Sequence, residues 1–203
     1  MKKYAFLLTA AAAVGFIFGA CSHEAPFLGE WEGNPQQIAA YIDGSGAMNA
    51  VTTISFMEGT AKSEGKVDLA QDYTVQRTIE YKPGVPFTVN AKGKSTASGR
   101  WTTDVDDADD LLLVFDDAAV KAEIADLQIT CPEALMNPET QAACDSISKV
   151  IRPQLTAEFE SAFRRDMSRY AVISDIKVVK NTGMISFEIQ QPEEDVTMRR
   201  VAP

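Results

Sequence analysis

KVDLAQDYTVQRTIEY, residues 66–81, is the stretch of this chain that decides its fold. Every second residue from position 67 onward is apolar except Gln71 and Arg77, and this period of two is typical of a β-strand with one buried face. The apolar members of that face are Val67, Leu69, Tyr73, Val75, Ile79 and Tyr81. The pattern predicts either one bent strand or two strands in tandem.

Shorter segments of the same kind lie on both sides of this strand. The expected strands are 50–57, 86–91, 97–103, 111–115, 172–180, 184–190 and 196–201. The Asn181-Thr182-Gly183 turn indicates a hairpin between two of the last three. Regular strands separated by short turns predict an antiparallel meander.

Two segments in the middle of the chain have helical spacing instead. They are 116–126 and 145–170, and the second carries an apolar stripe that extends from Ile147 to Tyr170. Pro153 interrupts the stripe, so this helix is expected to kink there or to begin with a separate turn. We therefore predict a mainly β protein, α+β overall, with a two-helix insertion at 116–170. The outer face of the 145–170 helix could contact a protein partner.

Two cysteines, Cys131 and Cys144, close a loop of 14 residues between the two expected helices. A disulfide there would stabilise the fold by about 3 kcal/mol if chain entropy dominates, and an oxidising compartment would favour it. The alternative is a metal site. However, the single histidine is His23, near the start of the chain, and no second pair of cysteines is near. The disulfide is the favoured interpretation.

The first 20 residues have the three-part layout of a secretory signal. Met1-Lys2-Lys3 is positive, 4–18 is uncharged and largely apolar, and Gly19-Ala20 supplies small residues before Cys21. An apolar stretch of about 15 residues makes roughly 22 Å of helix, short of the ~30 Å core of a bilayer. A removable signal, 1–20, is therefore expected rather than a spanning helix.

Phe18-Gly19-Ala20-Cys21 resembles the lipobox of bacterial lipoproteins, in which the cysteine is diacylated and becomes the first residue. Phe18 departs from the leucine usual at its place, and a secreted protein without lipid is the alternative. Two or three acyl chains, such as palmitate, hold a protein on a bilayer. The resemblance implies membrane attachment through Cys21, a polar tether at 21–26, and a place in the cell envelope, at the outer membrane of a Gram-negative bacterium.

Without residues 1–20 the chain keeps 183 residues, with 17 basic and 29 acidic side chains, so its formal net charge is −12. An acidic surface of this size repels nucleic acid, which is not an expected partner. The length suits one domain, residues 27–203, that carries the helical insert.

Two further motifs resemble the lipocalin-like (calycin-type) lipoproteins common in Bacteroidetes. Phe27-Leu28-Gly29-Glu30-Trp31-Glu32-Gly33 is similar to their opening Gly-x-Trp strand, and Gly99-Arg100-Trp101 with the strand after it is similar to an internal one. The segment from Ile173 to Val201 looks like their last three strands. The resemblance implies an up-and-down barrel, in which Trp31 and Trp101 are expected to be core residues.

A lipocalin-like barrel would direct one face of each strand into a lumen that holds packed side chains or one small ligand. Tyr73, Arg77 and Tyr81 share the inward face of the 66–81 strand and are the candidate ligand-binding residues. An inward Arg77 needs a carboxylate, carbonyl groups or an anionic ligand. An internal salt bridge, or a register that turns it to water, is favoured over a ligand.

No catalytic residue, cofactor motif or metal site is predicted. The lone histidine argues against serine or cysteine catalysis, and Gly44-Ser45-Gly46 is too short for a phosphate loop. The five aspartates within 104–110 are expected at an exposed hairpin tip, with a calcium site as the alternative. Three hypotheses follow: a structural or partner-binding protein with a filled barrel, a carrier or sensor of a small apolar or anionic ligand in the lumen, and an unrecognised hydrolase.

Overall fold

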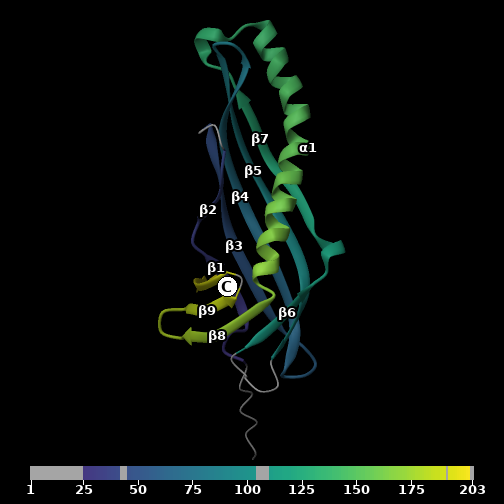
Figure 1. Cartoon of the computed structure of the whole chain (residues 1–203), viewed down its shortest axis with the longest axis vertical. Helices are drawn as coiled ribbons and strands as arrows, with labels where there is room; N and C mark the ends of the chain where they lie inside the picture. Colours follow the sequence, from purple (N-terminus) through teal and green to yellow (C-terminus); the bar gives the residue numbers. More distant parts are fainter. Residues whose placement is uncertain (1–24, 42–44, 104–109, 191, 202–203) are drawn as a thin grey trace, which may run out of the picture.

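The computed structural model describes residues 25–41, 45–103, 110–190 and 192–201, and shows an elongated molecule with a barrel at one end (Figure 1). Its strands are β1 Gly29–Gly33, β2 Gln36–Ala40, β3 Gly46–Glu58, β4 Glu64–Lys82, β5 Val85–Thr103, β6 Leu111–Phe115, β7 Lys121–Thr130, β8 Val172–Val179, β9 Met184–Gln190 and β10 Glu193–Arg200. The α-helix is α1, Pro138–Arg169, and two short 3₁₀ turns, η1 Asp117–Ala119 and η2 Glu133–Leu135, flank β7.

Eight of the strands form a closed antiparallel barrel. Their order around it is β1, β3, β4, β5, β6, β8, β9 and β10, and β1 closes the ring because it pairs with both β3 and β10. Apart from the omitted β2 and β7, this is the order of the chain. The predicted up-and-down barrel is therefore confirmed.

The three longest strands continue beyond the barrel. In β3, residues 53–56 pair with β1, whereas 47–50 pair with β2. In β5, residues 99–103 pair with β6, whereas 88–96 pair with β7. The far halves of β3, β4 and β5 thus form an open sheet in the order β2-β3-β4-β5-β7, and α1 lies along one face of it (Figure 1). We call this sheet with α1 the extension.

One prediction about the insert is wrong, because 116–126 is η1 followed by the start of β7 and not a helix. Val120 and Ile124 are four residues apart, which fits a helical spacing, but β7 pairs with β5 through a β-bulge that restores a strand pattern. The insert therefore holds one α-helix among its residues, all of which are described.

Helix α1 begins seven residues before the predicted 145–170 segment. Asn137 caps it: its side chain accepts hydrogen bonds from the backbone N–H groups of Glu139 and Thr140, and Pro138 occupies the first turn. Pro153 lies inside the helix. Among the residues that the structure describes, no helix is both long and apolar enough to span a membrane.

The predicted strands are present, except that two of them are parts of one longer strand. Residues 66–81 belong to the single long strand β4, and the segments 86–91 and 97–103 are two parts of one strand, β5, rather than two strands. Small residues in between, such as Gly93 and Ser95, break the apolar pattern although they are buried. Gly93 lies against the Phe159 ring of α1. The last three predicted strands correspond to β8, β9 and β10.

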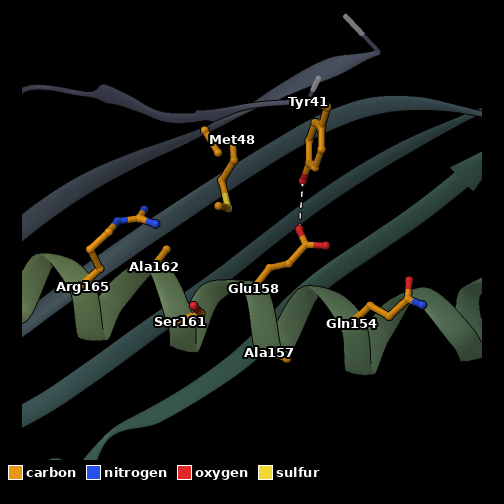
Figure 2. A pocket seen from close by; sticks show the side chains of 9 residues that line it. Tyr41, Met48, Gln154, Ala157, Glu158, Ser161, Ala162 and Arg165 are labelled. Atoms are coloured by element: carbon orange, nitrogen blue, oxygen red, sulfur yellow. Dashed lines mark hydrogen bonds between the residues drawn. The ribbon is translucent and has the colours of Figure 1, made fainter. Parts of the chain in front are cut away.

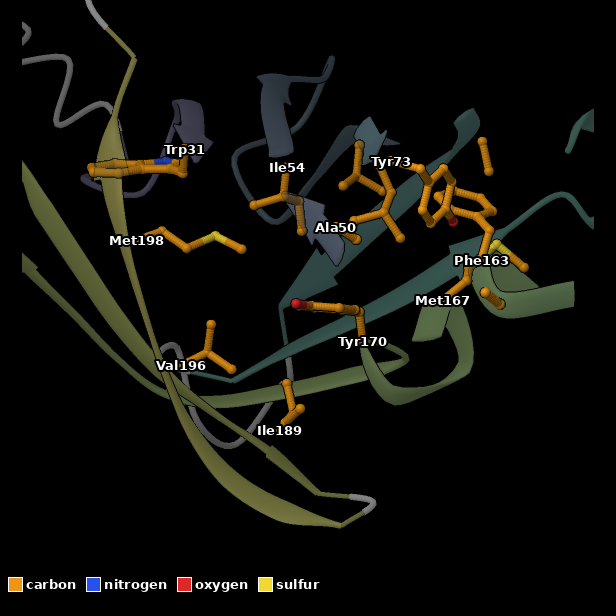
Figure 3. Packing of buried hydrophobic residues seen from close by; sticks show 14 of the residues in the cluster. Trp31, Ala50, Ile54, Tyr73, Phe163, Met167, Tyr170, Ile189, Val196 and Met198 are labelled. Carbon is orange, nitrogen blue, oxygen red and sulfur yellow. The ribbon is translucent and has the colours of Figure 1, made fainter. Parts of the chain in front are cut away.

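The inside of the barrel is packed with apolar side chains. Trp31 and Trp101 are buried as predicted, and their indole N–H groups donate to the backbone oxygens of Phe27 and Met57 at 2.7 and 2.9 Å. Phe27 packs edge-on against Trp101 at the same end. At the other end Tyr170, which follows α1, extends its ring among the barrel side chains (Figure 3). The barrel core and the underside of α1 form one continuous cluster.

Candidate functional site

Tyr73 and Phe159 join the middle of α1 to the sheet. Their rings stack with centroids 4.5 Å apart and an interplanar angle of 9°. Gly93 lies opposite Tyr73 on the neighbouring strand, and a Cβ there would approach Phe159 Cδ2 to 2.7 Å and Glu123 O to 2.6 Å. The absence of a side chain at Gly93 therefore makes the notch into which the Phe159 ring fits.

A buried polar network lies beside this stack. Gln71 Nε2 donates to Asp166 Oδ2 at 3.0 Å and to Thr52 Oγ1 at 3.1 Å, while its Oε1 accepts from the Tyr73 hydroxyl at 2.7 Å. Burial raises the pKa of Tyr73 far above its ordinary value, so the phenol is a donor at any physiological pH. These bonds satisfy polar groups that would otherwise destabilise the interface between β4 and α1.

Arg77 forms an ion pair, the interpretation favoured from the sequence. Its Nη1 lies 3.6 Å from Glu158 Oε1 of α1, its side chain is 11% exposed, and its guanidinium lies 4.9 Å from the centre of the Tyr41 ring. The Tyr41 hydroxyl donates to Glu158 Oε2 at 3.1 Å. Burial, with the nearby Glu158 carboxylate, raises the pKa of Tyr41 to about 12. Glu158 is thus held by two partners.

The three candidate residues do not share one cavity. Tyr73 and Arg77 face α1, but Tyr81 is 38% exposed and packs edge-on against Phe87 near the β4–β5 turn. A register shift between Glu80 and Lys82 breaks the alternation just there. The sequence pattern gave no sign of this shift.

A cleft of about 560 Å³ separates α1 from the β2–β3 side of the extension (Figure 2). Helix α1 packs mainly on β7, β5 and β4, which leaves this side less covered. The lining residues are Ala39, Tyr41, Met48, Gln154, Ala157, Glu158, Ser161, Ala162 and Arg165. In Figure 2, Tyr41 and Met48 point from the sheet toward the helix, and Glu158 and Arg165 point from the helix toward the sheet. The cleft is mostly apolar with two charged groups.

A second, more polar hollow of about 680 Å³ lies on the other side of Tyr41 and includes Arg77, Thr78 and Glu80. A third, about 560 Å³, lies at the barrel end beside Trp101, between Glu58, Lys66 and Arg100. In the second hollow the Arg77 guanidinium is already paired with Glu158, and the lining of the third contains acidic and basic side chains together.

The predicted disulfide is not formed, because Cys131 and Cys144 are free thiols in the structure. Both are buried in one small cluster with Phe87 and Ala143, at the far end of the extension. Burial raises the pKa of Cys144, with a further contribution from Cys131. Because β7 stands where the first helix was predicted, Cys131 directly follows a strand, and Cys144 lies near the start of α1. The pair therefore lies between a strand and a helix, not between two helices.

Several predictions lie outside the described residues. They are the signal at 1–20, Cys21, His23, and the aspartates at 104, 106, 107 and 109. Within the described part of the chain, no three His, Cys, Asp or Glu side chains are placed to hold a metal ion. Val150, 58% exposed, is the large apolar side chain of α1 that faces solvent; the rest of its apolar stripe is turned to the sheet.

The sequence reasoning missed the helix side of the site. Asp166 lies within the apolar stripe of α1, one turn from Ala162 and Phe163, just as Gln71 lies within the apolar face of β4. A polar residue on each of two buried faces is a signal that the two could pair. Tyr41 and Glu158 carried no such signal. Tyr41 directly follows a strand, and Glu158 lies beside the apolar stripe of α1 rather than within it.

No protein-family model, no curated protein and no solved structure matches this chain. The fold and the cleft are therefore inferred from the residues of this chain alone.

Proposed function

We propose that this chain is a lipid-anchored envelope protein of lipocalin-like fold that binds a small molecule, without catalysis, in the cleft between α1 and β2–β3. The observation that supports the cleft is the contrast between two spaces. The barrel interior is filled by Trp31, Ile54 and Leu69 and by the Tyr170 ring. The cleft, at about 560 Å³, has the size of ligand sites, which range from about 300 to 1,000 Å³.

The proposed anchor and the cleft belong to different parts of the molecule. Phe27, six residues after Cys21, packs against Phe56 and Trp101 at the closed end of the barrel. Met48, which lines the cleft, is eight residues before Phe56 on β3, or about 26 Å at 3.3 Å per residue. A lipid on Cys21 would therefore leave the cleft accessible from the aqueous side.

Titration of the protein comprising residues 22–203 with the neutral fluorescent probe N-phenyl-1-naphthylamine tests the cleft. Ser161 is an exposed lining residue, and Ser161→Trp fills the space between α1 and Met48. We expect this variant to lower the affinity for the probe at least tenfold. Ser146→Trp, at an exposed position of α1 outside the cleft, is the matched control and keeps the affinity of the parent. Equal affinities in all three proteins would refute the proposed site.

The anchor has its own test. Cells that express the full chain are labelled with radioactive palmitate, and the label should be absent from Cys21→Ala. Globomycin, which blocks lipoprotein signal cleavage, should cause the unprocessed form to accumulate. A Cys21→Ala protein that still carries palmitate would overturn the proposed lipidation.

A further inference from the structure

We infer that the cleft selects an aliphatic carboxylate, whose carboxylate group pairs with Arg165 and whose chain lies along Ala39, Met48 and Ala162. This inference rests on the proposed function, because it names the ligand class of the same cleft.

Arg165 has guanidinium N–H groups that are available to donate to a ligand. Its side chain is 61% exposed, and the ion pair that the structure gives it is to Asp166 Oδ1 at 3.9 Å, near the limit of such an interaction. Asp166 is already shared, since it also lies 3.9 Å from Arg169 Nη1 and accepts from Gln71. A guanidinium binds a carboxylate best through two parallel hydrogen bonds, which Asp166 does not supply here.

The other charged group of the cleft does not favour a cation. Glu158 lies two helical turns before Arg165, about 10 Å along α1. Its carboxylate accepts from the Tyr41 hydroxyl and is paired with Arg77, so its charge is largely compensated. The cleft thus has one available positive charge at one end and a neutralised pair at the other.

The walls between these ends suit a flexible chain. Ala39, Ala157 and Ala162 keep the space open, and Met48 extends its thioether across it (Figure 2). Methionine is unbranched and adapts to ligands of different shape. An alkyl chain over these residues buries apolar surface while the carboxylate stays at the exposed guanidinium, as amphipathic groups commonly do.

Displacement of N-phenyl-1-naphthylamine from residues 22–203 by decanoate, decanol and decylamine tests the inference, with each compound below its micelle concentration. We expect decanoate to bind most tightly. Arg165→Gln should weaken decanoate about tenfold and leave decanol within twofold of the parent, because the alcohol makes no charged contact. Arg165→Lys keeps the positive charge and should recover part of the decanoate affinity.

Arg164→Gln is the matched control. Arg164 is the neighbouring arginine of α1, but it pairs with Glu160 and Asp117 and does not line the cleft. Its loss should leave decanoate binding unchanged. Far-ultraviolet circular dichroism and a urea midpoint equal to those of the parent show that each variant is folded.

The outcomes separate the two proposals. Decanol or decylamine binding as tightly as decanoate, or decanoate binding that is insensitive to Arg165→Gln, overturns the carboxylate inference. If Ser161→Trp nevertheless weakens binding of the probe, the cleft remains a binding site, but for another class of ligand. If none of the three compounds displaces the probe and Ser161→Trp binds it normally, both proposals fail.

Discussion

Replacement of Gly93 by alanine tests how α1 is held on the sheet. A Cβ at this position would lie 2.7 Å from Phe159 Cδ2 and 2.6 Å from the backbone oxygen of Glu123, both shorter than real Cβ contacts. Neither neighbour moves easily. The Phe159 ring is stacked on Tyr73, and the Glu123 oxygen belongs to β7.

The expected loss of stability follows from two opposing effects. Overpacking of a closed core costs about 1–3 kcal/mol, whereas alanine gains roughly 0.5–1 kcal/mol over glycine inside a strand. Because both obstacles are rigid, the cost lies toward the upper end, and the net loss is about 2 kcal/mol. For a domain of this size that corresponds to a Tm lower by about 4–8 °C.

Urea unfolding of residues 22–203, followed by tryptophan fluorescence, gives the free energy of unfolding. Gly33→Ala is the matched control, since a Cβ at Gly33 meets its nearest atom at an ordinary 3.5 Å and should cost little. Phe159→Leu removes the ring, so Gly93→Ala combined with Phe159→Leu should lose at least 1 kcal/mol less than the two single losses added. An unchanged Gly93→Ala protein, or additive losses, would refute the packing argument.

Three further predictions concern the buried groups. Asp166→Ala should lower the free energy of unfolding by about 2 kcal/mol, because it removes a charged acceptor from Gln71, and a cycle with Gln71→Leu should show coupling in urea unfolding. Burial raises the pKa of Tyr170 from 10.0 to about 12, so the folded state keeps a proton that the unfolded state loses above pH 10. Stability should therefore fall by about 2 kcal/mol between pH 10 and 12, and this part of the fall should be absent in Tyr170→Phe. In protein that is produced in a reducing cytoplasm, Cys131 and Cys144 should react with Ellman's reagent only after unfolding. Fast labelling of the folded protein would contradict their burial.

Antiparallel strands could be predicted from the sequence because segments such as 66–81 carry a period of two, whereas their closure into a barrel was implied by the resemblance to lipocalin-like proteins. The alternation at 66–81 belongs to β4, and the tryptophans at 31 and 101 are in the core as expected. That the strands β3, β4 and β5 leave the barrel could not be predicted. A strand that is buried on one face has the same pattern whether it faces a barrel interior or a helix.

The error at 116–126 has a similar cause. Val120 and Ile124 fit a helix, and only the pairing of β7 with β5 across a bulge decides for a strand. Such pairing depends on residues more than twenty positions away, which local spacing does not contain. For the site, Arg77 and its need for a carboxylate were predictable, but the identity of its partner, Glu158, depends on where α1 lies.

The closure of the barrel by β1 has a consequence for the kinetics of folding. Trp31 pairs with Arg200 and also with Ile54, so the ring of strands is completed only when residues near both ends of the described chain meet. Contacts between such distant positions slow folding, because the entropy of a long loop is lost before the contact forms. The β4–β5 hairpin and its cover by α1 can form earlier from closer segments. The extension is therefore expected to act as the nucleus, and the barrel to be the part whose formation limits the rate.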